Sequence, residues 1–401
     1  MRPYRSSSAV LLRLTLILFS LVITSVTCAG VTRGERAAGD GVEAASVKPV
    51  PLTRAETQEL IRSGYRHYYS MEYAQAERDF RHLVEAEPQS AAAINHLLTA
   101  ELFSALNQAG ALNTSAYASN HFLALKKQVK LDTSTRSELR SLMQRALRIS
   151  DARLASHAND ADALYDRGVT RALNATYQAL VEHSWYSALR LAVGARRDHQ
   201  RVLELNPARA DAKTIVGMHT YIAGSLPWTM RTAAVVVGFS GNKERGLKML
   251  REAAAADSES SIDAKVALAL FLRREEKYDE ALEVVRSLIA TYPRNFLFAL
   301  EEANLLKDMG SNQAALDAFT RLVARVQHGA FAAPRIEFAY YGLGEMHRGR
   351  HEYSQAAEAY EAVLGTSGID PELRQRTEAA IREVNEITSH RAQQMNDSSL
   401  P

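Results

Sequence analysis

The stretch Tyr278-Asp-Glu-Ala-Leu-Glu-Val-Val285 returns in pattern 34 residues later as Asn312-Gln-Ala-Ala-Leu-Asp-Ala-Phe319. Segments 73–80 and 353–360 follow the same pattern, with Ala at the fourth place and a bulky residue at the eighth. Apolar residues spaced three and four apart share one face of a helix. The pattern therefore predicts one helix that recurs along the chain.

Small residues and, in several copies, prolines stand at fixed offsets from the Ala of this helix. A small residue 12 positions before the Ala lets a preceding helix approach closely, and a Pro 12 positions after it ends the helix. The small residues are Gly64, Ala269, Ala303 and Gly344, and the prolines are Pro88, Pro207 and Pro293. The repeating unit is therefore a pair of helices.

A 34-residue unit of two helices resembles the tetratricopeptide repeat (TPR) family. The resemblance implies an all-α fold, a right-handed superhelix of antiparallel helix pairs, with about seven pairs over residues 56–388. Regular repeats are expected at 262–370, as units 262–295, 296–329 and 337–370, and a solvating cap helix at 371–388. The tail, 389–401, is expected to be disordered.

The middle of the chain, 91–258, is expected to hold expanded repeats. Long helical patterns lie around 89–108 and 134–156. Gly168 lies about 15 residues too early to be the ordinary partner of the helix that begins near Ala195, which predicts a lengthened first helix. Within this region Gly238-Phe-Ser-Gly-Asn242, followed by Gly246 and Leu250, resembles the tetratricopeptide-39 family over 225–254. A weaker resemblance joins the same stretch to periplasmic TPR proteins associated with TRAP transporters.

The N-terminus has the pattern of a secretory signal peptide over residues 1–29. Arg2, Arg5 and Arg13 precede a short apolar run, and small residues predict cleavage after Ala29. Two alternatives are lipidation of Cys28 and an uncleaved anchor, and either would attach the protein to a membrane. Residues 30–55 are rich in Gly, Pro and small residues, which predicts a flexible linker. We expect an exported, periplasmic protein; a membrane-anchored lipoprotein and a secreted protein are the alternatives.

The composition argues against several classes of function. The chain of 401 residues has 48 Lys and Arg against 46 Asp and Glu, which disfavours binding of nucleic acid by charge alone. The single cysteine excludes an internal disulfide. We find no P-loop, GxGxxG, HExxH or GxSxG motif. A lytic enzyme would need a catalytic Glu in a domain outside the repeats, but the remaining region, about 91–240, is itself repeat-like.

Candidate binding residues come from the alignment of the regular repeats. The first helix of each pair lines the concave groove of such an array. Arg273, Lys307 and Arg348 fall at equivalent places, Asn304 and Glu345 one turn earlier, and Tyr341 on the same face. Three cations in a row could hold a peptide carboxylate or an acidic segment. Alternatively, they are solvated cations near helix C-termini, where the helix dipole favours them.

Two other features have a structural and a functional interpretation. Trp228 and Phe239, in the apolar insertion 225–241, are either buried against a neighbouring repeat or exposed as a contact for a partner or membrane surface. His347 and His351 have metal-compatible spacing but flank a predicted turn, so no metal site is expected.

These patterns together predict a non-catalytic protein without cofactors that binds a protein or peptide partner in the groove of a TPR array. The alternative is a periplasmic accessory subunit of a solute transporter, binding a small ligand in the expanded middle repeats. An apolar-walled pore around Gly217 and Gly246 would favour that alternative.

Overall fold

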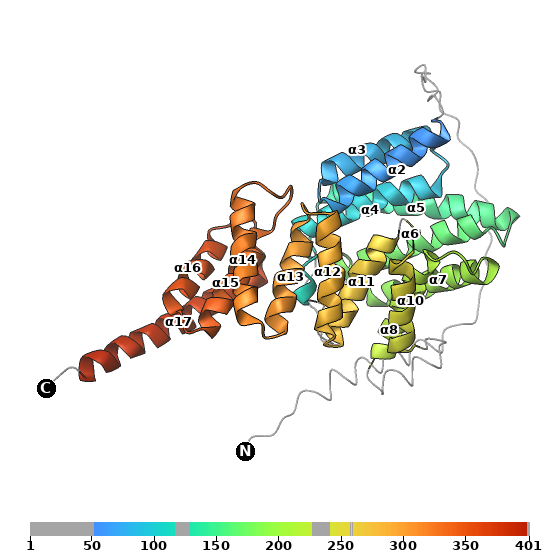
Figure 1. Ribbon diagram of the computed structural model, residues 1–401. Coiled ribbons are helices and arrows are strands. Elements are labelled where there is room, and N and C mark those ends of the chain that lie inside the picture. Colours follow the sequence, from blue (N-terminus) through green and yellow to red (C-terminus); the bar gives the residue numbers. More distant parts are fainter. Residues whose placement is uncertain (1–51, 117–128, 227–240, 257, 259, 399–401) are drawn as a thin grey trace, which may run out of the picture.

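The protein is a chain of helix pairs. The computed structural model describes residues 52–116, 129–226, 241–256, 258 and 260–398, and these contain fifteen α-helices, one 3-10 helix and no strand. The prediction of an all-α helical repeat is confirmed (Figure 1). The pairs are α2 (Arg54–Tyr69) with α3 (Tyr73–Ala86), α4 (Ala91–Gln108) with α5 (Thr133–Ser156), α6 (Ala161–Leu180) with α7 (Trp185–Leu205), α8 (Ala212–Ser225) with α10 (Lys243–Ala254), α11 (Ser261–Arg274) with α12 (Tyr278–Thr291), α13 (Phe296–Asp308) with α14 (Asn312–Gln327), and α15 (Ile336–Gly349) with α16 (Tyr353–Leu364), followed by α17 (Pro371–Ser398).

Glycines at the predicted crossings are in contact with aromatic rings of the second helix. A Cβ atom on Gly64 would lie 2.3 Å from the ring of Phe80, and one on Gly344 would lie 2.5 Å from the ring of Tyr360. Real atoms do not approach so closely, so only glycine fits at either position. The predicted role of these small residues is confirmed.

Prolines follow the ends of helices as predicted, and polar residues cap the helices that come next. Pro88, Pro207 and Pro293 each stand two residues beyond the last residue of α3, α7 and α12. Asn295 then accepts a hydrogen bond from the Phe298 amide at 3.1 Å, which caps the first turn of α13. Each turn between pairs is thus defined by local chemistry.

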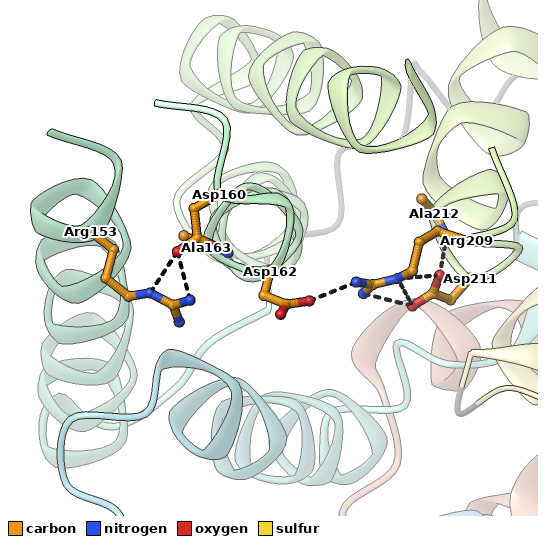
Figure 2. A network of polar contacts seen from close by, with 7 residues as sticks. All are labelled: Arg153, Asp160, Asp162, Ala163, Arg209, Asp211 and Ala212. Carbon is orange, nitrogen blue, oxygen red and sulfur yellow. Dashed lines mark hydrogen bonds and ion pairs between the residues drawn. The ribbon is translucent and has the colours of Figure 1, made fainter. Parts of the chain in front are cut away.

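A polar network joins the expanded middle pairs (Figure 2). Asp160 caps α6 and also accepts a hydrogen bond from Arg153 of α5 at 2.7 Å. Arg209 donates to Asp162 of α6 at 2.7 Å and to Asp211, the cap of α8, at 3.1 Å. The N-termini of two successive first helices are therefore linked through one arginine.

Gly168 predicted a lengthened first helix in this middle pair, and the structure shows that both helices are lengthened, because α7 begins at Trp185 and not near Ala195. Helices α6 and α7 have 20 and 21 residues, against 14 each in α11 and α12. A Cβ atom on Gly168 would lie 2.3 Å from the imidazole of His199, so the crossing falls one turn beyond Ala195.

The first and last thirds of the chain meet in the interior. The hydroxyl of Tyr69 donates to Asp263 at 3.0 Å, and the amide of Asn295 donates to the carbonyl of Tyr69 at 2.7 Å. Arg335 donates to the carbonyl of Gln108, and Met71 belongs to the hydrophobic core of helices α8–α15. We call this contact between α2–α4 and α11–α15 the seam; Figure 1 shows the N-terminal helices beside α12 and α13.

The ends of the array differ from the sequence-based expectation. Helix α2 begins at Arg54, because Thr53, near the end of the expected linker, forms a capping box with Glu56. Helix α17 continues to Ser398 through the residues expected to be a disordered tail. Residues 372–398 contain neither Gly nor Pro, so nothing in that segment ends the helix. The expected leader, residues 1–29, lies outside the described residues. Within the part of the chain that is described, no helix combines the length and apolarity that a membrane crossing requires.

Candidate functional site

A cavity of about 530 Å³ lies inside the array where the last two repeats face the loop after α4. We call it the interior groove. Helices α13 and α15 form one wall, the first turns of α17 close one end, and residues 110–115 with the junction of α6 and α7 form the opposite wall. The groove is therefore built by segments that are far apart in the sequence.

Four of the six predicted binding residues line this groove. They are Arg273, Asn304, Lys307 and Tyr341. The other two, Glu345 and Arg348, lie beyond its lining at the contact of α15 with the last helices. Arg348 pairs with Glu345 at 3.1 Å and with Glu383 of α17 at 3.1 Å. Helix α17 therefore forms an ion pair with Arg348, the last of the three predicted cations.

Arg273 is a buried, ion-paired residue and is not free to bind a ligand through its charge. Its side chain is 3% exposed and pairs with Glu301 at 3.0 Å and with Asp308 at 2.7 Å. It also donates to Thr114 at 3.3 Å and to Ser115 at 3.4 Å. Burial raises the pKa of Glu301, and the positive charge of Arg273 opposes that rise. The pair thus fixes the loop after α4 against α11 and α13.

Asn304 and Lys307 are two residues of the groove whose side-chain polar groups face the cavity. Asn304 is only 5% exposed, and Lys307 is half-buried one turn later on α13. Within the described ranges, neither side chain has a hydrogen-bond or ion-pair partner. A carboxamide can both donate and accept, and an ammonium can donate three hydrogen bonds. These two groups can therefore receive a polar ligand in the groove.

Aromatic side chains complete the groove, and one of them was not among the predicted residues. Trp185 stands at the start of α7 with 41% of its surface exposed. Tyr341 lies beneath Arg376 of α17, whose guanidinium is 4.9 Å from the ring centre and donates to the Tyr341 hydroxyl at 3.2 Å. The sequence feature that could have indicated Trp185 as a binding residue is the aromatic pair in His-Ser-Trp-Tyr, residues 183–186.

The remaining predicted features are placed as follows. Trp228 and Phe239 lie outside the described residues. His347 lies 2.7 Å from Glu352 and His351 lies 3.0 Å from Tyr353, so the two imidazoles have different neighbours. No group of three or more His, Cys, Asp or Glu residues suited to a metal occurs in the described ranges.

The small-ligand alternative depends on the surroundings of Gly217 and Gly246. These two glycines bring α8 and α10 into direct contact, since a Cβ atom on Gly246 would lie 2.6 Å from the Tyr221 nitrogen. The adjoining cleft has a mixed lining on its described side, with Arg196, Glu204 and Arg245 beside the apolar Leu203, Val216 and Met249. The apolar-walled pore that would favour this alternative is not seen among the described residues.

Comparisons with known proteins give a family match for part of the chain and similar solved structures of low sequence identity. The family model Iml2/Tetratricopeptide repeat protein 39 matches residues 225–368. A search of curated proteins gives no match. Similar solved structures include a tetratricopeptide repeat protein from Parabacteroides merdae, with 16% identity, 82% of this chain and 99% of that chain covered, and a TM-score of 0.36. Yeast Tom70 is similar with 12% identity, coverage of 86% and 93%, and a TM-score of 0.31.

The repeated helix pairs and the family match over residues 225–368 define the class: this part of the chain is a tetratricopeptide-repeat array. Within that class, the resemblance of 225–254 to the tetratricopeptide-39 family is confirmed, and the match extends through the last regular repeats. Proteins of this class act as scaffolds for protein interaction.

Proposed function

We propose that the protein is a non-catalytic scaffold that binds an extended peptide segment of a partner in the interior groove. The observation that carries this proposal is the buried Asn304 beside Lys307, facing a cavity with no partner for either side chain within the described residues. An extended peptide has unsatisfied backbone N–H and C=O groups that the Asn304 carboxamide can bind. Lys307 then receives a carboxylate of the same segment.

The aromatic residues of the groove supply the apolar part of recognition. Trp185, Phe338 and Tyr341 present rings to the cavity, and aromatic side chains supply large contact areas in interfaces. Asp308 and Glu372 also line the groove, so its charge is mixed. We therefore expect a ligand with both apolar side chains and a carboxylate rather than a uniformly acidic peptide.

Selection of random peptides on the full-length protein tests this function. Selected peptides are measured by fluorescence anisotropy against the wild type, Asn304→Ala and Lys307→Ala. Each substitution removes a hydrogen-bonding group from the groove and should weaken binding about tenfold. Lys277→Ala is the matched control, because Lys277 pairs with Glu244 away from the groove lining. Peptides that bind all four proteins equally would contradict the proposal.

We also propose that the protein is exported, with residues 1–29 as its leader. The basic start, the short apolar run and the small residues before Gly30 support this proposal. Mass spectrometry of the protein from its native source should give an N-terminus at Gly30. A chain that retains Met1 would contradict cleavage, and a lipid mass on Cys28 would show attachment to a membrane instead.

A further inference from the structure

A second cavity, of about 160 Å³, lies at the seam between α2–α4 and α11–α13. We call it the seam cavity. It is distinct from the interior groove, although the Arg273–Glu301 pair touches both: Arg273 lines the groove and Glu301 lines the seam cavity. A ligand here would contact both the first and the last third of the chain.

Aromatic rings form much of the wall of the seam cavity. Tyr68 is central: its ring centre is 4.9 Å from that of Tyr69, 6.0 Å from that of Tyr73 and 6.1 Å from that of Phe103. All four residues line the cavity. The interplanar angles are 66°, 69° and 89°, so the rings meet edge to face and present surfaces in different directions. The faces of such rings attract cations through their quadrupoles.

A carboxylate without a cationic partner stands among these rings. Asp263 accepts a hydrogen bond from Tyr69 at 3.0 Å, and no basic group of the described residues pairs with it. Its side chain is accessible to solvent, yet the surrounding protein disfavours the charged form and raises the pKa to about 6. The carboxyl is therefore mainly ionised at pH 7.5.

The other acidic side chain of the cavity, Glu301, already has a cationic partner. Glu301 is paired with Arg273 and accepts a hydrogen bond from Thr114. The uncompensated charge of the described cavity wall is thus the single negative charge of Asp263. An anion would be repelled, and a neutral apolar ligand would cover Asp263 without pairing its charge. A cation with an apolar body satisfies both the rings and the carboxylate.

We propose that the seam cavity binds a small alkylammonium group, held by Asp263 and the rings of Tyr68, Tyr69, Tyr73 and Phe103. A volume near 160 Å³ is similar to that of cavities that bind benzene, about 150 Å³, so the group is small. The same chemistry is offered by a free amine such as choline and by the side chain of a lysine or methylated lysine in a peptide. This site is separate from the interior groove, so its failure leaves the peptide-binding proposal intact.

Isothermal titration calorimetry on the full chain at pH 7.5 tests the proposal. Choline is compared with 3,3-dimethylbutan-1-ol, which has the same shape without the charge. Choline should bind at least about tenfold more tightly. Short peptides with lysine, trimethyl-lysine or acetyl-lysine form the second arm. Binding of the charged peptides but not of the acetylated one assigns the ammonium group to a peptide, whereas binding of choline alone assigns it to a free amine.

Variants show whether choline binds in the seam cavity or at acidic residues elsewhere on the surface. Asp263→Asn keeps the acceptor for Tyr69 and removes the charge, so it should weaken choline binding about tenfold or more. Phe103→Leu keeps Asp263 and an apolar side chain at this position but removes a ring, and it should weaken binding as well. Glu283→Gln, an exposed acid on α12, is the control and should bind as the wild type does. Equal binding of choline and its neutral analogue, no binding of any ammonium, or full binding by folded Asp263→Asn and Phe103→Leu overturns the proposal.

Discussion

The guanidinium of Arg273 and the carboxylate of Glu301 form an ion pair of 3.0 Å in which the two side chains are 3% and 6% exposed. The pair lies between α11 and α13, and Thr114 of the loop after α4 contacts both partners. It therefore links two adjacent repeats to a segment about 160 residues earlier in the chain. Such a buried pair holds the geometry of the interior groove.

Replacing Arg273 by Met should be strongly destabilising. Glu301 would remain buried without its cation, and breaking a buried pair on one side typically costs about 3–5 kcal/mol. Urea denaturation followed by circular dichroism measures the loss. Adding Glu301→Met to Arg273→Met removes the orphaned charge and should recover part of the stability.

Arg251→Met is the matched control for this prediction. Arg251 and Glu280 are also in adjacent pairs and lie 2.6 Å apart, but both side chains are more than a third exposed. Solvent screens such pairs, so the loss should stay below about 1 kcal/mol. Equal losses for Arg273→Met and Arg251→Met would show that the burial of Arg273 has no energetic importance.

Two glycines of α15 should respond oppositely to alanine. A Cβ atom on Gly344 would lie 2.5 Å from the ring of Tyr360, whereas one on Gly349 would meet no atom within 4 Å. Gly344→Ala should cost about 1–3 kcal/mol through overpacking. Gly349→Ala should be neutral or stabilise by up to about 1 kcal/mol, because alanine favours the helix. Thermal denaturation of both variants checks this difference, and a Gly344→Ala protein as stable as the wild type would contradict the close crossing.

The helix pairs could be predicted from sequence because their determinants are local. Gly344 and Tyr360 are 16 residues apart, and Gly64 and Phe80 have the same separation. Both residues of each contact therefore fall within one 34-residue repeat, where an alignment of the repeats shows them. The prolines and caps are equally local. Repetition supplies several copies of each signal, which makes the pattern visible in one sequence.

The groove was predicted only in part, because it depends on contacts across the seam. Asn304, Lys307 and Tyr341 follow from the repeat alignment, and all three line the cavity. The alignment made Arg273 equivalent to Lys307, but the structure buries Arg273 against Thr114 and Glu301. The curvature that brings residue 114 to residue 273 accumulates over several expanded pairs, and no short pattern encodes it.

Asn295 should contribute more than an ordinary helix cap. It caps α13 through Phe298 and also donates from its amide nitrogen to the Tyr69 carbonyl across the seam, at 2.7 Å. Asn295→Ala loses both interactions in a buried position, so we expect a loss of about 2–3 kcal/mol. Ser90→Ala removes only the cap of α4 and should cost about 1 kcal/mol. Urea denaturation compares the two variants. Equal losses would mean that the bond across the seam adds nothing.

His96 should make the fold sensitive to mild acid. His96 is 9% exposed, and its Nδ1 lies 2.7 Å from the Tyr65 hydroxyl. Burial lowers the pKa of His96 to about 4. An unfolded histidine has a pKa near 6.5, so between about pH 6.5 and pH 4 the unfolded chain binds a proton that the folded chain does not. The stability due to neutral His96 is therefore present above that window and is lost as the pH falls through it.

The difference between the wild type and His96→Asn isolates this effect, because other groups that titrate in the window, such as Glu101 and Asp166, are common to both proteins. The Asn oxygen can replace Nδ1 as a partner of Tyr65 but does not titrate. Between pH 7.5 and pH 5 the wild type should lose about 2 kcal/mol more than His96→Asn, as urea denaturation at the two pH values would measure. His82→Asn changes an exposed histidine and should follow the wild type. Parallel pH profiles for the wild type and His96→Asn would show that protonation of His96 does not oppose folding.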